Sequence, residues 1–314
     1  MESNFLDVLR EHTAGDPMRE GVKWTDLTRQ EISRRLGELG TPAGKGVVKQ
    51  LLKKHGYVKR KARKTRAMGS RHPDRNAQFE NIARLKQEYL AAGQPVVSID
   101  TKKKELLGNF YRDGKLYTQE AIRVFDHDFP SAASGAVFPH GLYDLRLNLA
   151  HINLGTSHET SQFACDSIER WWQQQGHPQY PQATKLLLLC DGGGSNSASR
   201  YVFKEELQQL ANRLGLEIRV AHYPPYCSKY NPIEHRLFPH VTRACQGVVF
   251  HTVQIVKELM EKTKTSTGLQ VTVDVIDKVY EIGRKCAKGF KKNMKIAFDS
   301  LLPKWNYRAI PATA

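Results

Sequence analysis

The sequence predicts a mixed α/β domain, built from a sheet flanked by helices, with a small helical domain before it. Apolar runs of strand length alternate with stretches of helical apolar spacing from residue 95 onward. The continuous apolar run at 186–190 is typical of a strand that is buried on both faces. Positive charge collects instead in the first 71 residues. We therefore expect a basic N-terminal domain at 1–66, a connecting helix at 67–92 and the α/β domain at 93–314.

The first clear helix of the N-terminal domain is predicted to follow Thr28. Thr28 and Glu31 form a capping-box pattern, in which each side chain can bond the backbone N–H of the other residue. Gly40 is a suitable stop for this helix. Its apolar positions recur at helical spacing and are Ile32, Leu36 and Leu39. An earlier packing helix would contain Phe5, Leu6 and Leu9.

A second helix is predicted after Thr41, with Pro42 in its first turn. Two short helices joined by a tight turn, the second of them basic, are typical of a DNA-binding helix-turn-helix. The alternative is an ordinary helical hairpin with a solvated basic face. Seven lysines and four arginines between Gly44 and Arg71, without any Asp or Glu, favour DNA. The residues expected to contact phosphates are Lys45, Lys49, Lys53 and Lys54 on the helix, and Lys59, Arg60, Lys61 and Arg63 in the linker.

The α/β domain is predicted from a series of strands and helices after a helical stretch at 75–92. The expected strands lie at 95–101, 106–112, 119–125, 135–145, 147–155, 184–190 and 216–223, and the expected helices at 158–176 and 199–214. Trp171 and Trp172 are expected in the core rather than as platforms for stacked bases.

Three acidic residues lie where secondary structure can bring them to one place. Asp100 and Asp191 each end an apolar run. Glu234 follows Asn231, a suitable helix N-cap, and Pro232, a suitable first helical residue. Taken singly, these acids have simpler interpretations as caps, surface residues or charges that complement a helix dipole. Taken together, they can hold two divalent cations about 3.5–4 Å apart, which is an arrangement used for phosphoryl displacement.

Composition favours a polyanionic partner. A formal net charge of +16 on 314 residues suits nucleic acid or an anionic membrane. The longest aliphatic run, at 186–189, is too short to span a bilayer, and the N-terminus lacks the regions of a signal peptide. We therefore expect nucleic acid as the partner, no membrane, and a cytoplasmic, nucleoid-associated protein. The five cysteines form no C-x-x-C pair, which predicts reduced thiols rather than a zinc site or disulfides.

Three stretches of the sequence resemble the catalytic blocks of DDE transposases, which have an RNase H-like core. They are residues 93–110, 191–196 and 228–238. The resemblance is to the Rhodopirellula-type DDE transposases of bacterial insertion sequences, and it covers roughly residues 20–308. Glu234 follows Asp191 by 43 residues, a longer spacing than is usual in mariner-like relatives. Members of the family usually have a longer N-terminal DNA-binding region, so we expect part of that region to be missing here.

The resemblance implies that the α/β domain is RNase H-like and that Asp100, Asp191 and Glu234 are its catalytic and metal-binding residues. The implied cofactor is two Mg²⁺ ions, for which Mn²⁺ can substitute. The implied reaction nicks transposon ends in double-stranded DNA, and the freed 3′-OH then attacks target DNA. Pairing of two ends would need a homodimer or a higher oligomer on the DNA. Further phosphate contacts are expected from Lys102, Lys103, Lys104, Lys229 and Arg236.

Two alternatives stay open at this point. One is a nuclease of the same fold without strand transfer, because fold does not fix function. The other is a truncated, non-catalytic relative that only binds DNA. The three acids favour an enzyme over the binding protein, and the helix-turn-helix pattern favours a transposase over a general nuclease.

Overall fold

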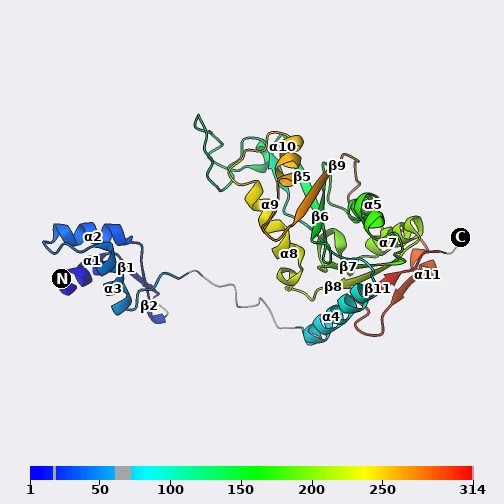
Figure 1. Ribbon diagram of the computed structural model, residues 1–314, viewed down its shortest axis with the longest axis horizontal. Coiled ribbons are helices and arrows are strands. Elements are labelled where there is room, and N and C mark those ends of the chain that lie inside the picture. Colours follow the sequence, from blue (N-terminus) through cyan, green and yellow to red (C-terminus); the bar gives the residue numbers. More distant parts are fainter. Residues whose placement is uncertain (17–18, 61–71, 313–314) are drawn as a thin grey trace. The chain divides into compact units, whose positions relative to one another are not determined.

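The computed structural model describes residues 1–16, 19–60 and 72–312 of the chain (Figure 1). The chain separates into two compact units, Met1–Arg66 and Ala67–Ala314. Within the described ranges, no helix has the length and apolar character that crossing a membrane requires.

The N-terminal unit contains three helices and an antiparallel strand pair. Its elements are α1 (Glu2–Glu11), β1 (Thr13–Asp16), β2 (Arg19–Thr25), α2 (Arg29–Glu38) and α3 (Lys45–Lys54). The predicted capping box is confirmed. The Thr28 hydroxyl accepts a hydrogen bond from the Glu31 N–H at 3.2 Å, and the Glu31 carboxylate accepts one from the Thr28 N–H at 2.8 Å. The helices enclose a small core that includes the fully buried Phe5, Ile32, Leu36 and Val48.

Two details of this unit differ from the sequence predictions. The second helix does not start at Pro42, because α3 begins at Lys45 with Gly44 as its N-cap. The pair β1–β2 was not predicted, since its strands are short and lack a clear apolar alternation.

The C-terminal unit is built on a mixed sheet that has nine strands within the described residues. The strand order is β10-β11-β8-β7-β3-β5-β6-β9, and β4 pairs with β5 off this path. Strands β3, β7 and β8 run parallel to one another, whereas β5 is antiparallel to β3. The strands are β3 (Val96–Thr101), β4 (Glu105–Leu107), β5 (Gly135–Asp144), β6 (Leu149–Gly155), β7 (Lys185–Cys190), β8 (Glu217–His222), β9 (Gln270–Ile276), β10 (Ile296–Phe298) and β11 (Asn306–Ala309).

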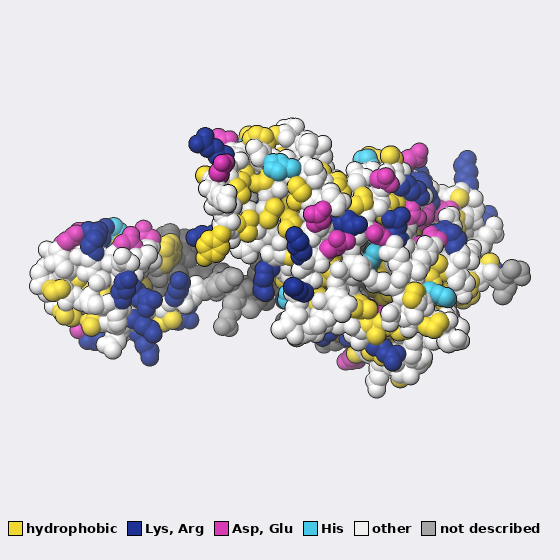
Figure 2. Space-filling view, turned by 45° about the horizontal axis from the view of Figure 1, so that its top comes forward, with side chains coloured by type: hydrophobic (Ala, Val, Ile, Leu, Met, Phe, Trp, Pro, Cys, Tyr) yellow, Lys and Arg dark blue, Asp and Glu magenta, His cyan; other side chains and the backbone are white. Residues whose placement is uncertain are grey.

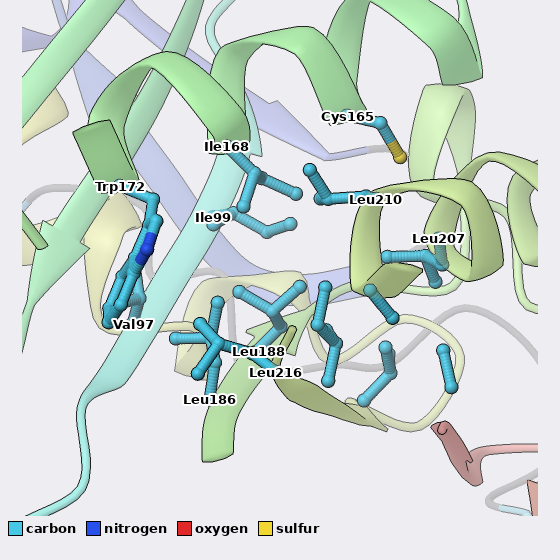
Figure 3. Packing of buried hydrophobic residues seen from close by; sticks show 14 of the residues in the cluster. Val97, Ile99, Cys165, Ile168, Trp172, Leu186, Leu188, Leu207, Leu210 and Leu216 are labelled. Carbon is cyan, nitrogen blue, oxygen red and sulfur yellow. The ribbon is translucent and has the colours of Figure 1, made fainter. Parts of the chain in front are cut away.

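Helices cover both faces of this sheet. On one face, α5 and α7 pack on side chains such as Ile99 and Leu188 (Figure 3). On the other face, α4 packs on Val96 and Leu187, while α8, α9 and α10 pack on β5 and β6. The helices are α4 (Arg75–Ala91), α5 (Ser161–Trp171), α6 (His177–Gln179), α7 (Tyr201–Leu214), α8 (Ile233–Arg236), α9 (Phe238–Ala244), α10 (Val253–Glu261) and α11 (Phe290–Asn293). Trp171, the last residue of α5, and the next residue, Trp172, are buried in the core, as predicted.

The strand predicted at 106–112 is present only in its first two residues, as part of β4, and the strand predicted at 119–125 is wrong. Strand β4 ends at Leu107, and apart from the short turn η1 (Pro130–Ala132) the segment up to Gly135 has no regular structure. Tyr117 and Ile122 are exposed there, so their apolar character has no neighbouring strand to pair with. The helix predicted at 158–176 is α5 followed by the π-helical turn η2 (Trp172–Gly176).

Candidate active site

Two of the three predicted acids are brought together by neighbouring parallel strands. Asp100 lies in β3, and Asp191 directly follows β7. The register of the two strands pairs Val96 with Leu187 and advances one residue at a time. Continued by two residues beyond the last pair, it sets Asp100 opposite Asp191. Adjacent strands lie about 4.7–4.9 Å apart, and side chains at matching positions point to the same face. Both acids therefore point to the face that α4 and α8 cover.

The third acid reaches this place because α8 is bonded to β3. The Ser98 hydroxyl donates to Asn231 Oδ1 at 2.5 Å and accepts from the backbone N–H of Ile233 at 3.0 Å. Asn231 Nδ2 donates to the carbonyl oxygen of Ile99 at 3.1 Å. Ser98 and Asn231 are fully buried. These bonds hold the start of α8, and with it Glu234, against the strand that carries Asp100.

Asn231 does not act as the predicted side-chain N-cap. Helix α8 begins at Ile233 with Pro232 as its N-cap residue, and its N-terminus has no side-chain cap bond. The side-chain amide of Asn231 bonds to Ser98 and Ile99 instead. The backbone carbonyl oxygen of Asn231 accepts from the Glu234 N–H at 3.0 Å. The expected placement of Glu234 in the first turn of a helix is nevertheless confirmed.

Gly141 provides the space for this close approach. It pairs with Asp100 across β3 and β5. A methyl group on Gly141 would lie 2.9 Å from Ile233, 3.0 Å from Phe238 and 3.3 Å from Leu237. The absence of a side chain therefore lets α8 and α9 settle on the sheet next to the first acid.

The three acids repel one another. Burial and then the charge of Asp191 raise the pKa of Asp100 to about 8; the hydrogen bond from the Thr101 N–H opposes this rise, and the proximity of Glu234 adds to it. A bound cation would offset the cost of ionising Asp100 beside two other acids, so this arrangement favours a cation. The structure thus brings Asp100, Asp191 and Glu234 together.

Backbone N–H groups bond one oxygen of each of two carboxyl groups. Asp100 Oδ1 accepts from the N–H of Thr101 at 2.8 Å, and Asp191 Oδ1 accepts from that of Gly193 at 3.2 Å. Among residues 1–16, 19–60 and 72–312, no three His, Cys, Asp or Glu side chains are arranged to hold one metal ion. The oxygen donors suit Mg²⁺ or Mn²⁺ in kind and number.

A buried polar group lies beneath Asp191. His222 Nδ1 donates to the Asp191 carbonyl oxygen at 2.8 Å, so its Nε2 accepts from the Tyr307 hydroxyl at 2.9 Å. Burial lowers the pKa of His222 to about 4, which keeps the ring neutral. Sequence reasoning missed His222, Ser98 and Gly141 as parts of the site. Only Ser98 left a signal, as a polar residue inside the apolar run at 95–99.

The lysines predicted to bind DNA through the N-terminal unit are on its surface. Lys45, Lys49 and Lys53 are four residues apart on α3 and exposed. Lys54 is exposed and pairs with Glu2 at 2.7 Å. Figure 2 shows Lys and Arg side chains together on the visible face of this unit. Lys59 and Arg60 are exposed after α3, whereas Lys61 and Arg63 lie outside the described residues.

The predicted phosphate contacts near the acids differ in their surroundings. Lys102 forms an ion pair with Glu105, which also pairs with Arg112, and the three side chains are largely buried. Lys103 and Lys104 are exposed. Lys229 and Arg236 are exposed on either side of Glu234. Lys102 thus has a structural partner already, while the other four basic side chains face solvent near the acids.

A mixed sheet covered by helices, with acids at the ends of neighbouring strands, is the arrangement that the sequence resemblance to DDE transposases predicts. The family model described as Rhodopirellula transposase DDE domain matches residues 4–311. The chain belongs to this family of transposases, whose activity is DNA transposition and recombination.

Solved structures similar to this chain include three of the Mos1 transposase. They are a pre-cleavage Mos1 transpososome (12% identity, TM-score 0.46), a Mos1 mariner paired end complex with Mn (13%, 0.44) and a mariner Mos1 paired end complex with Mg (14%, 0.47). Each match covers 83% of this chain and 70% of the other. A comparison with curated proteins finds no match.

Proposed function

We propose that this chain is the transposase of a bacterial insertion sequence, which cuts transposon ends and joins them to target DNA by metal-dependent phosphoryl transfer. The observation that carries the proposal is the convergence of Asp100, Asp191 and Glu234, where burial and then the charge of Asp191 raise the pKa of Asp100 to about 8. Membership of the transposase family supports the same conclusion. The proposed core is RNase H-like, with domains at 1–66, 67–92 and 93–314 as the sequence indicates.

In this proposal the three carboxylates provide the oxygen ligands for Mg²⁺ or Mn²⁺. Two such cations, when bound, activate the attacking oxygen and stabilise the leaving oxygen. Asp100 and Asp191 would face the DNA from adjacent strand ends, and Glu234 would close the site from α8. The Ser98–Asn231 bonds and the space at Gly141 keep Glu234 in reach. Lys103, Lys104, Lys229 and Arg236 would contact phosphates on both sides of the scissile bond.

The N-terminal unit is proposed to be a helix-turn-helix that binds double-stranded DNA. Exposed lysines at every fourth position of α3 support this assignment. Replacing Lys49 and Lys53 by Gln should lower the slope of log affinity against log salt by about 0.9 for each phosphate that the variant no longer binds. Fluorescence anisotropy with a labelled duplex measures that slope. An unchanged slope would show that these two lysines do not contact DNA phosphates. The active form on DNA is proposed to be at least a dimer, because two ends must be paired.

Cleavage of duplexes that carry the DNA flanking the gene tests the proposed activity. The wild-type chain should nick these duplexes with Mg²⁺ and join the freed 3′ end to a second duplex. Asp191→Asn should lower both rates by about 10³-fold. Asp126→Asn, which removes the same charge from an exposed loop, should leave both rates unchanged. Nicking without joining would instead identify a nuclease, and binding without nicking by the wild type would identify a non-catalytic DNA-binding protein.

A further inference from the structure

A second basic surface lies near the C-terminus, in residues 284–295. This segment carries six basic residues and no acid, which are Arg284, Lys285, Lys288, Lys291, Lys292 and Lys295. Its five lysines are exposed. Within the described part of the chain, the ion pairs of this segment involve Arg284 alone. The five lysines therefore present positive charges to solvent, and no carboxylate in the described part of the chain forms an ion pair with them.

The segment is fixed to the body of the unit although most of it is irregular. Arg284 pairs with Glu205 at 3.3 Å and with Glu206, and both acids are buried. Glu205 also accepts from the backbone N–H of Ala287 at 3.1 Å. Farther along, Phe290 and Met294 pack against the core beneath α5 and α7. Because the backbone is already held, a partner that binds these lysines has little of the segment left to order.

A continuous series of contacts joins this segment to the acidic site. The Nζ atom of Lys291 lies 4.4 Å from the centre of the Tyr201 ring. The same ring lies 5.5 Å from Nζ of Lys204, which donates to the carbonyl oxygen of Ala198 at 2.6 Å. The N–H of Ala198 donates at 3.3 Å to the carbonyl oxygen of Gly192, which directly follows the second acid of the site. These contacts place Lys291 beside the first residue of α7, at the end of the sheet where the loop after β7 begins, whereas Lys295, whose carbonyl oxygen accepts from the Ile310 N–H, lies nearer the start of β8.

We propose that residues 284–295 form a phosphate-binding surface that holds duplex DNA as it leaves the active site on the Asp191 side. The inference rests on the proposed function, because DNA that reacts at the three acids must continue past them. Lys side chains bind phosphates as point charges and carry no base preference, so the contact is independent of sequence. The surface adds to the contacts expected from α3 and from the lysines beside the acids.

The matched comparison uses two triple variants of the full chain with equal loss of charge. The test variant carries Lys288→Gln, Lys291→Gln and Lys292→Gln. The control carries Lys185→Gln, Lys262→Gln and Lys264→Gln, which are also exposed. The control lysines lie at the opposite end of the sheet from the acids. Lys185 begins β7, and Lys262 and Lys264 precede β9, whose first residue pairs with Leu149. Both sets carry Asp191→Asn as well, so that cleavage does not disturb the binding measurement.

Affinity is measured by anisotropy between about 50 and 200 mM salt, the range in which phosphate contacts alter binding strongly. One labelled probe is a mixed-sequence duplex, and the other is a duplex of the DNA that flanks the gene. The test variant should bind on the order of 10²-fold more weakly at 0.1 M salt, with a salt slope smaller by up to about 2.7. The control variant should bind within about twofold of its parent.

Weaker binding of both probes supports a phosphate contact that is independent of sequence, and weaker binding of the flanking probe alone limits the contact to DNA bound as a transposon end. Equal affinities of the test and control variants for both probes, with equal melting temperatures, would overturn the inference. That outcome is separate from the proposed activity, because nicking by the chain with its natural Asp191 is measured without these variants.

Discussion

Ser98→Ala should weaken both the fold and the candidate site, because the Ser98 hydroxyl forms two of the bonds between β3 and the start of α8. The Ser98 hydroxyl donates to Asn231 Oδ1 at 2.5 Å and accepts from the Ile233 N–H at 3.0 Å. An alanine at this position leaves both partners buried without this hydrogen bond. Each buried polar group that loses its partner costs about 1–3 kcal/mol. We expect the free energy of unfolding to fall by about 2–4 kcal/mol.

The same substitution should lower the nicking rate by about 10–100-fold, the range seen when groups that orient metal ligands are removed. The effect should appear as a higher Mg²⁺ concentration for half-maximal activity, since Glu234 is then held less firmly. Urea unfolding followed by tryptophan fluorescence measures stability, because Trp171 and Trp172 lie in the core of the sheet. Nicking is assayed well below the unfolding transition, so that the two effects separate.

Ser167→Ala is the matched control for this substitution. Ser167 is also fully buried, and its hydroxyl oxygen has no hydrogen-bond partner among the described residues. Its replacement should change the free energy of unfolding by less than about 1 kcal/mol and leave nicking intact. Nicking by a folded Ser98→Ala variant at the wild-type rate and Mg²⁺ dependence would refute the idea that Ser98 positions Glu234.

Three further predictions follow from the surroundings of the acids and from the buried core. Gly141→Ala should lower the free energy of unfolding by about 1–3 kcal/mol, because the added methyl group overpacks Ile233 and Phe238, and it should slow nicking. Gly135→Ala on the same strand, where the nearest atom would lie 3.5 Å away, should do neither. Urea unfolding and the nicking assay measure both variants. Burial lowers the pKa of His140 to about 3, so the contribution of His140 to stability is complete above its unfolded pKa. This contribution falls by up to about 1.4 kcal/mol per pH unit as the pH drops from about 6.5 toward 3. The urea midpoint of His140→Phe should therefore decline less than that of the wild type over this range, and parallel declines would contradict the prediction. Mn²⁺ at about 100 times its Kd should stabilise the wild-type chain by about 2.7 kcal/mol in a thermal melt, and an equal rise for Asp191→Asn would place the ion elsewhere.

Features encoded by neighbouring residues could be predicted from the sequence. The capping box of α2 depends on residues three positions apart, and the structure contains it as expected. The strands that lead to Asp100 and Asp191 are recognisable as apolar runs, because both faces of each strand are covered by helices. These two runs predict that each acid ends a strand, while the parallel pairing of β3 with β7 puts both acids at the same edge of one sheet.

Features that depend on distant partners could not be predicted in the same way. The apolar residues at 119–125 resemble a strand, but a strand needs a neighbour to bond with, and none of the described strands pairs with them. The Asn231-Pro232 pair resembles a helix start, yet the Asn231 side chain bonds to Ser98, which lies 133 residues earlier in the chain. Local propensity failed at 119–125 because no described strand pairs with this segment, and at Asn231 because a distant residue bonds its side chain.

The arrangement of the site depends on a single strand, β3. The side chains of Val97 and Ile99 point to the core under α5 and α7, so the alternate positions Ser98 and Asp100 share the opposite face. Asp191 reaches that face through the parallel pairing of β7 with β3, and Glu234 reaches it through Asn231 and Ser98. A buried hydroxyl is unfavourable unless it is hydrogen-bonded, and Ser98 meets this condition only when α8 is in place. The polar residue two positions before the first acid therefore links the folding of β3 to the placement of the third acid.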